Sequence, residues 1–254
     1  MIRQTLSGIV TAVRTLTILP FPGKDAERFS TALYWFPFVG LLIGAFQAIV
    51  MYVGMLTGWV EFAGFATVLT GVIMTRGLHA DGLADLADGF WGGKNRESVL
   101  RIMKDPNVGS FGVLALFFLM LLKWMVVTKL AAVQDYGSLV IGILLARWVQ
   151  VQLASLMPYA RREGGTAQSF VVGAGSFHMV VTTLCTVLLI FPLAHNDMTH
   201  VAVALISAAG AAAAAAVIAY RKIGGVTGDV LGASSELTEC VVWLACLLSS
   251  AMLV

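Results

Sequence analysis

The chain has 254 residues, of which 59% are hydrophobic and 12% are Asp, Glu, Lys or Arg. A soluble domain carries about 25% charged residues, so this composition excludes an ordinary soluble protein. A net charge of +2 is too small for a typical nucleic-acid-binding protein. Because apolar runs long enough to cross a bilayer recur, we expect a single membrane-embedded domain, residues 1–254, of the all-α class.

The N-terminal segment, residues 1–23, lacks the pattern of a cleaved signal peptide. Arg14 interrupts its apolar stretch, and no small-residue cleavage site follows. The segment is expected to stay in the protein as an interfacial or re-entrant helix.

The rest of the chain is expected to form a polytopic bundle of six to seven transmembrane helices. The expected spans are residues 33–56, 59–75, 111–127, 138–157, 178–193 and 201–220, with a last span that begins near Val230. The final apolar segment, residues 240–254, crosses a bilayer only if its helix begins that early. The three cysteines lie in apolar segments without zinc-ligand spacing and are expected to be packing residues.

Lys and Arg are distributed unevenly over this bundle. If the N-terminus lies in the cytoplasm, thirteen of them fall in cytoplasmic segments and only Lys129 falls in an outside loop. The thirteen are Arg3, Arg14, Lys24, Arg28, Arg76, Lys94, Arg96, Arg101, Lys104, Arg161, Arg162, Arg221 and Lys222. By the positive-inside rule, this pattern predicts an inner-membrane protein whose polar motifs face the cytoplasm.

The stretch GLHADGLADLADGFWGG, residues 77–93, contains three acids and neither Lys nor Arg. Asp81, Asp85 and Asp88 are four and three residues apart, so on a helix they share one face. Carboxylates this close repel one another and require a cation, and their oxygens suit Mg²⁺, Mn²⁺ or Ca²⁺. We expect a metal site here; the alternative is a hydrated helix that displays its acids to solvent.

The sequence leaves more than one role possible for His79, Gly82 and Gly89 of this stretch. His79 is either a hydrogen-bonded structural residue or a functional one. Gly82 and Gly89 leave room for a ligand or a neighbouring helix. Gly92 and Gly93 are expected to end the helix.

Bases flank the acids, namely Arg76 before them and Lys94, Arg96, Arg101 and Lys104 after them. Acids that bind metal, bracketed by bases, indicate a phosphate-bearing substrate. For Lys94 and Arg96, the alternative role of membrane anchors is favoured. The stretch RIMKDPNVGSFGV, residues 101–113, adds Lys104, Asp105 and Ser110 at a helix N-terminus, which is a site that favours anions.

A second acidic motif, GGVTGDVLGASSELTE, occupies residues 224–239 and lacks the spacing of a phosphate-binding P-loop. Asp229, Glu236 and Glu239 lie roughly on one helical face. Because acids in a membrane helix are costly, we expect Asp229 and Glu236 to be functional. Arg147 is a candidate partner for one of these acids, and a purely structural ion pair is an equal alternative.

The three stretches together resemble the signatures of the cobalamin synthase family, the adenosylcobinamide-GDP ribazoletransferases. Their order and spacing match, and the resemblance covers nearly the whole chain. It implies an integral membrane, Mg²⁺-dependent transferase that joins adenosylcobinamide-GDP to α-ribazole or its 5′-phosphate, giving adenosylcobalamin or its phosphate and GMP. Arg76 stands where family members often have Gly, which leaves the acid motif intact.

On this resemblance, Asp81, Asp85 and Asp88 would hold Mg²⁺ against the diphosphate, and one of them or His79 would take the proton of the ribazole hydroxyl. The expected substrate-binding residues are Arg76, Lys104, Asp105, Ser110, Asp229, Glu236 and Glu239. A homo-oligomer, or a complex with other cobalamin-pathway enzymes in the lipid bilayer, is left open, because no residue points to either.

Two other functions fit parts of the pattern. CDP-alcohol phosphotransferases carry the motif D-G-x-x-A-R, then G-x-x-x-D-x-x-x-D, but this chain lacks the Ala-Arg pair and its acids are too close together. A cation-coupled transporter also uses membrane acids, yet these usually lie near the bilayer midplane in repeated halves. No repeat is visible in this chain.

Overall fold

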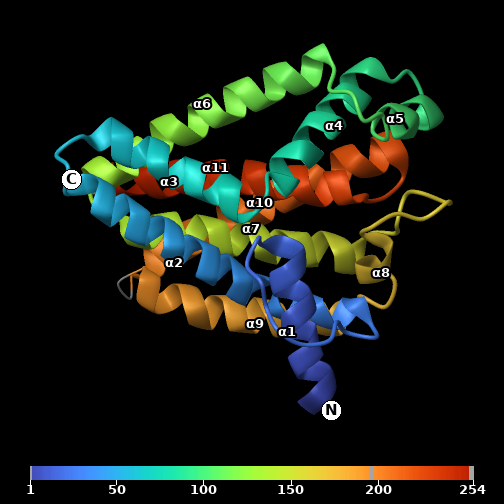
Figure 1. Ribbon diagram of the computed structural model, residues 1–254, viewed down its shortest axis with the longest axis horizontal. Helices are drawn as coiled ribbons and strands as arrows, with labels where there is room; N and C mark the ends of the chain where they lie inside the picture. The colour runs from blue at the N-terminus through green and yellow to red at the C-terminus, as the bar shows by residue number, and fades with distance from the viewer. Residues whose placement is uncertain (1, 195–196, 252–254) are drawn as a thin grey trace.

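The computed structural model describes residues 2–194 and 197–251, and in these ranges all of the named elements are helices (Figure 1). In chain order they are α1 (Ile2–Leu16), the 3₁₀ helix η1 (Phe29–Trp35), α2 (Phe36–Met55), α3 (Val60–Met74), α4 (Leu78–Gly92), α5 (Arg96–Ile102), α6 (Ser110–Ala132), α7 (Tyr136–Leu156), α8 (Gln168–Val171), α9 (Ser176–Leu193), α10 (Met198–Ile223) and α11 (Gly228–Ala251). The predicted all-α class is therefore confirmed.

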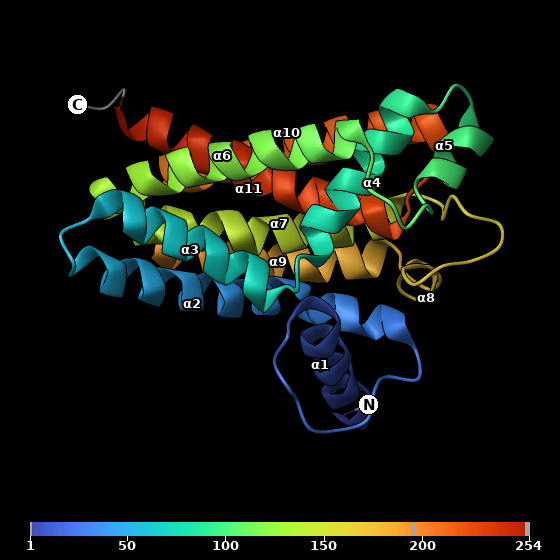
Figure 2. The same ribbon diagram turned by 45° about the horizontal axis from the view of Figure 1, so that its top comes forward.

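Six helical segments of the described chain are long and apolar enough to cross a membrane. They are η1 with α2, then α6, α7, α9, α10 and α11, while α3 is a shorter apolar helix. These helices run along the long axis of the molecule (Figures 1 and 2). The predicted number of spans is confirmed, and the last one begins at Gly228, close to the expected Val230.

The helix α7 forms the centre of the bundle. Every residue from Ser138 to Ala154 is buried, because α2, α9, α10 and α11 all pack around this helix. The outer helices α9 and α10 expose most of their surface, including large apolar side chains such as Leu188 and Ile206. An outer surface of this kind suits contact with lipid acyl chains.

The N-terminal helix α1 lies across the direction of the bundle helices, beside η1 (Figure 2). Arg14 closes the loop that follows α1, since it donates to the carbonyl oxygen of Phe21 at 3.0 Å and pairs with Asp25 at 3.1 Å. This crosswise orientation suits the expected interfacial helix, whose place in a bilayer stays a prediction.

The chain changes direction between α3 and α4. Arg76 and Gly77 both adopt the left-handed backbone conformation, with φ of 54° and 67°, which ends one helix before the next begins. The helix α4 then packs along the first part of α11 and the start of α6. As predicted, α4 ends at Gly92, with Gly93 as its C-terminal cap.

Glycines allow α4 and α11 to touch backbone to backbone. A Cβ atom added at Gly82 would lie 3.0 Å from the Cα of Asp229, and one added at Gly232 would lie 3.2 Å from the Cα of His79. Of the two explanations left open for Gly82, the approach of a neighbouring helix is therefore the one observed.

The polar connections gather at one end of the bundle, on the right in Figure 1. These connections and the helix ends beside them hold Lys94, Arg96, Arg101, Lys104, Arg161, Arg162, Arg221 and Lys222. Lys129 lies in the last turn of α6, towards the other end. This separation agrees with the charge pattern in the sequence, while the assignment of the basic end to the cytoplasm stays a prediction.

Four charged side chains meet inside the bundle, and we call them the ion cluster. Lys123 of α6 pairs with both Glu236 and Glu239 of α11, the latter at 2.6 Å. Arg147 of α7 pairs with Glu239 at 2.9 Å. Two cations thus face two anions, which is the condition for burying charge away from water. The cluster joins α6, α7 and α11, and it confirms that Arg147 pairs with one of the C-terminal acids.

Replacing Lys123 with Met is expected to destabilise the bundle, because Glu236 then loses its cation. Breaking a buried ion pair costs about 3–5 kcal/mol, so the variant should unfold at a clearly lower temperature in detergent. Lys129→Met changes an exposed lysine of the same helix and is the matched control. Equal unfolding temperatures for the two variants would contradict a stabilising role of the ion cluster.

Candidate active site

Three carboxylates come together where α4 packs on the start of α11. Asp81 and Asp85 lie on α4, and Asp229 lies in the first turn of α11. Both Asp81 and Asp229 add negative potential at Asp85. We call these three residues the acid cluster. It joins residues of the first and third sequence motifs, which are far apart along the chain.

The carboxyl group of Asp85 has a shifted acidity. Partial burial, followed by the negative charges of Asp229 and Asp81, raises its pKa to about 6, although Arg161 acts in the opposite direction. Asp85 therefore exchanges its proton close to neutral pH. A partly buried acid with such a pKa is typical of functional sites.

Arg161 supplies positive charge to the acid cluster. It lies in the connection between α7 and α8, and its Nη2 donates to Asp229 Oδ2 at 2.7 Å and to the carbonyl oxygen of Met103 at 3.2 Å. The sequence marked Arg161 only as one of many bases in a polar loop. Its role depends on a tertiary contact, for which the sequence carries no local signal.

Arg96 holds the loop that carries Arg161. Its Nε donates to the carbonyl oxygen of Ile223 at 2.8 Å, and its Nη2 donates to that of Ala160 at 2.5 Å. A backbone bridge between Tyr159 and Val226 adds to this link. The loop after α7 is thereby fixed to the turn between α10 and α11, next to Asp229.

Asp88 binds the N-terminus of α6. Its two oxygens accept hydrogen bonds from the backbone N–H groups of Gly109 at 2.7 Å and Gly112 at 2.9 Å. A helix N-terminus favours an anion, and here the anion is a side chain of the protein itself. The anion site expected near Ser110 is thus filled by Asp88, and α4 is fixed to α6.

The remaining predicted residues of the second motif lie at the surface. Lys104 pairs with Glu163 at 2.9 Å, and both side chains are exposed. Asp105 accepts hydrogen bonds from the backbone and side chain of Asn107, which lower the pKa of its carboxyl group. Ser110 is exposed in the first turn of α6. The structure therefore brings none of these residues into the acid cluster.

Of the other predicted substrate-binding residues, Arg76 lies near the acid cluster, whereas Glu236 and Glu239 lie in the ion cluster. The side chain of Arg76 is exposed, donates to the carbonyl oxygen of Arg14 at 3.2 Å, and lines the same pocket as Asp81. Glu236 and Glu239 belong to the ion cluster, where Lys123 and Arg147 bind them. Their expected contact with substrate stays a prediction.

A basic pocket of about 470 Å³ lies at the surface beside the acid cluster. Five bases line it (Arg96, Arg101, Lys104, Arg161 and Arg162), against two acids, Glu97 and Glu163. Such an excess of guanidinium groups favours phosphate oxygens. Arg161 connects this pocket to the acid cluster through its pair with Asp229.

A second pocket, of about 360 Å³, lies on the other side of that ion pair, and we call it the His79 pocket. Asp81 and Asp229 lie at its polar side, while Phe36, Phe170 and several leucines make it largely apolar. His79 lines it and is 1% exposed. Burial, with the nearby charges of Arg147 and Lys123, holds the pKa of His79 well below its ordinary value, so the imidazole is neutral.

The acid cluster has the donor atoms that Mg²⁺ prefers. In the described part of the chain, no three His, Cys, Asp or Glu side chains form a group that could hold a metal ion. Mg²⁺, however, usually binds one or two carboxylates and completes its coordination with water and substrate phosphates. Asp81 and Asp85 fit that pattern. Asp88 as a third ligand stays a prediction, because its oxygens already bind α6.

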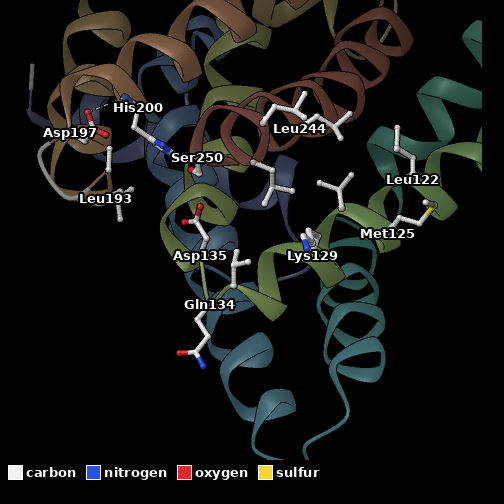
Figure 3. Close-up of a pocket in the computed structure, with 15 residues that line it drawn as sticks. Leu122, Met125, Lys129, Gln134, Asp135, Leu193, Asp197, His200, Leu244 and Ser250 are labelled. Carbon is white, nitrogen blue, oxygen red and sulfur yellow. Dashed lines mark hydrogen bonds between the residues drawn. The ribbon is translucent and has the colours of Figure 1, made fainter. Parts of the chain in front are cut away.

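A third pocket, of about 930 Å³, lies at the opposite end of the bundle (Figure 3). Its polar groups mainly hold loops: Asp135 accepts from the hydroxyl of Ser138 at 2.6 Å, and Ser138 is hydrogen-bonded to His200 at 2.9 Å. Most of its lining is apolar side chains such as Leu244 and Met125. It has neither the acid cluster nor the basic surface of the other end.

The comparisons with known proteins indicate a single family. The sequence model of the family described as cobalamin-5-phosphate synthase matches residues 8–247. The chain is 60% identical to the adenosylcobinamide-GDP ribazoletransferase of Pelodictyon phaeoclathratiforme, over 97% of this chain and 99% of that protein. It is 58% identical to the protein of the same name from Chlorobium chlorochromatii, over 98% and 99%, and 32% identical to that from Shewanella oneidensis, over 95% and 94%. No solved structure matches.

The two outer acids of the first motif are expected to differ in their effect on stability. Asp88→Ala leaves two backbone N–H groups at the start of α6 without an acceptor, which costs about 1–3 kcal/mol. Asp81→Ala removes an exposed side chain and should leave the unfolding temperature in detergent nearly unchanged. If Asp88→Ala proved no less stable than Asp81→Ala, the role of Asp88 as a helix cap would be wrong.

Proposed function

The chain belongs to the cobalamin-5-phosphate synthase family, and on this premise we propose that it is an adenosylcobinamide-GDP ribazoletransferase. It would join adenosylcobinamide-GDP to α-ribazole or α-ribazole 5′-phosphate and release GMP. The observation that carries the proposal is the junction of the acid cluster with the basic pocket, through the Arg161–Asp229 pair. An acid pair that suits Mg²⁺ next to a site for phosphate is what a diphosphate substrate requires.

The proposed reaction exchanges one phosphate linkage for another. A hydroxyl oxygen of the ribazole attacks the phosphorus that is attached to the cobinamide. The bond from this phosphorus to the bridging oxygen breaks, and GMP leaves with that oxygen. The hydroxyl proton is transferred to a base.

Protein groups have distinct tasks in this scheme. Arg161, with Lys104 and other bases of the basic pocket, would bind phosphate oxygens of the donor. Asp81 and Asp85 would hold Mg²⁺, which neutralises negative charge on the diphosphate and on the departing GMP. Asp88 would keep α4 in place through its bonds to α6.

Between the two kinds of base considered from the sequence, we favour a carboxylate over His79. A general base works best when its pKa is near the working pH. Asp85, with a pKa of about 6, meets this condition, whereas the pKa of His79 lies well below its ordinary value. Asp85 is thus ionised at neutral pH, and the one of its two oxygens that does not bind the metal is the candidate to accept the proton.

The membrane setting is also part of the proposal. Six helices of membrane-spanning length in the described residues make this an integral membrane protein. We place the basic end in the cytoplasm, where Mg²⁺ and nucleotide substrates occur, and the bundle in the inner membrane. The concentration of Lys and Arg at that end supports this orientation.

Asp85→Asn is expected to lower the rate of GMP release by about 100-fold or more, because it removes a ligand of the metal and the proposed base. The variant should remain folded, since Asn has nearly the same shape. The assay supplies adenosylcobinamide-GDP, α-ribazole and Mg²⁺ to protein in lipid. Glu61→Gln, in the exposed first turn of α3 and outside both pockets, is the control and should retain turnover. Full activity of Asp85→Asn would disprove its assignment.

The dependence on Mg²⁺ is expected to change with pH around the pKa of Asp85. Above about pH 6 its carboxyl group is ionised and can bind the ion; below that value it is protonated and cannot. At subsaturating Mg²⁺, kcat/KM should therefore fall by up to about tenfold per pH unit as the pH drops through 6. A profile that stays flat between pH 7 and 5 would contradict an ionised Asp85 in the reaction.

A further inference from the structure

The His79 pocket contains polar atoms that no residue of the described chain satisfies. Both ring nitrogens of His79 and Oε1 of Gln150 are buried without a hydrogen-bond partner there. The two side chains are only 1% and 3% exposed, and both line the pocket. Each buried polar group left unpaired costs about 1–3 kcal/mol. A ligand that offers matching groups would remove this cost.

Gln150 is held so that one end of its amide remains available. Its Nε2 donates to the carbonyl oxygen of Leu231 at 3.2 Å, which leaves Oε1 as a free acceptor. A neutral imidazole such as His79 carries one N–H donor and one acceptor nitrogen. The two side chains that line the pocket therefore leave one donor and two acceptors unpaired beside it.

The rest of the wall suits a flat apolar ring system. Phe36 and Phe170 lie 5.9 Å apart between ring centroids, and Leu16, Leu33 and Leu231 also line the pocket. Sites for small molecules usually span about 300–1,000 Å³. At about 360 Å³, this pocket is of a size for a nucleoside and far too small for a corrinoid.

Charge separates the two pockets that meet at the Arg161–Asp229 pair. Asp81 and Asp229 line the His79 pocket, where they would repel a phosphate group, with Arg76 as its one lining base. The basic pocket has five bases and two acids and attracts phosphate. The uncharged nucleoside part of the acceptor, rather than any 5′-phosphate that it carries, therefore suits the first pocket, and the phosphate-bearing donor suits the second.

We propose that the His79 pocket binds the acceptor nucleoside, with its benzimidazole ring packed against the wall of Phe36, Phe170 and the leucines, and with its polar atoms hydrogen-bonded to His79 and Gln150. The free ring nitrogen of a benzimidazole nucleoside accepts a hydrogen bond, which the N–H of His79 can donate. A ribose hydroxyl donates one, which Gln150 Oε1 can accept. This assignment rests on the proposed transferase function and adds the position of the acceptor to it.

The first test uses Gln150→Leu, which keeps the size of the side chain and removes the acceptor. The loss of one hydrogen bond should raise both the Kd for α-ribazole, measured by calorimetry without the donor, and its KM by about 3- to 10-fold. The KM for adenosylcobinamide-GDP should not change. Gln152→Leu is the control: Gln152 is a buried amide of the same helix that contacts Thr182 and does not line the pocket.

The result separates the two proposals. If the wild-type protein is active and Gln150→Leu has the same Kd and KM for α-ribazole, the pocket assignment alone is overturned. A rise in the KM for adenosylcobinamide-GDP instead would assign the pocket to the donor and also overturn it. A folded wild-type protein that neither binds α-ribazole nor releases GMP would overturn the transferase function and the assignment together.

A second test does not change the buried wall. Thr166 is exposed and lines the pocket, whereas Ser169 is exposed outside it. The rate at which a maleimide labels the introduced cysteine is measured after the rate for the wild-type protein has been subtracted. Saturating α-ribazole should lower this rate at least about threefold in Thr166→Cys and should leave it unchanged in Ser169→Cys. Equal labelling of Thr166→Cys with and without saturating α-ribazole would contradict the proposal even if Gln150→Leu failed to fold.

Discussion

A charge inside an apolar bundle must be paired, and this constraint organises the structure. Lys123 and Arg147 neutralise Glu236 and Glu239, and the N-terminus of α6 neutralises Asp88. The acid cluster is different, because Asp81, Asp85 and Asp229 together exceed the positive charge of Arg161. Burial first, and then this excess, raises the pKa of Asp85. Where the protein leaves negative charge unbalanced, a bound cation can supply the balance.

The same pairs also bring the motifs together. Asp88 fixes α4 to the start of α6, and the glycine contacts at Gly82 and Gly232 fix α4 to α11. Arg161 then joins the loop after α7 to Asp229. The first motif thus lies beside both of the others, bound to the second through Asp88 and in contact with the third through glycines. Such contacts between motifs explain why polar residues so costly in a membrane are concentrated in these segments.

Much of this architecture could be predicted from the sequence, because hydropathy and helical periodicity are local properties. The spans, the helical face of Asp81 and Asp85, and the end of their helix at Gly92 were all predictable. The roles of Asp88 and Arg161 were not, since each depends on a partner distant in the chain. For Glu236 the sequence indicates the cost of a buried acid, but it does not identify Lys123 as the partner, because α6 and α11 meet only in the folded chain.

The most direct test of the central claim is turnover by the purified wild-type protein in lipid. The assay would contain adenosylcobinamide-GDP and α-ribazole, with Mg²⁺ or with a chelator, and would follow GMP and the corrinoid product together. The account predicts equal amounts of GMP and cobalamin with Mg²⁺, and neither with the chelator. GMP and cobalamin formed at the same rate in the chelator, or no product at all from folded protein with Mg²⁺, would contradict it.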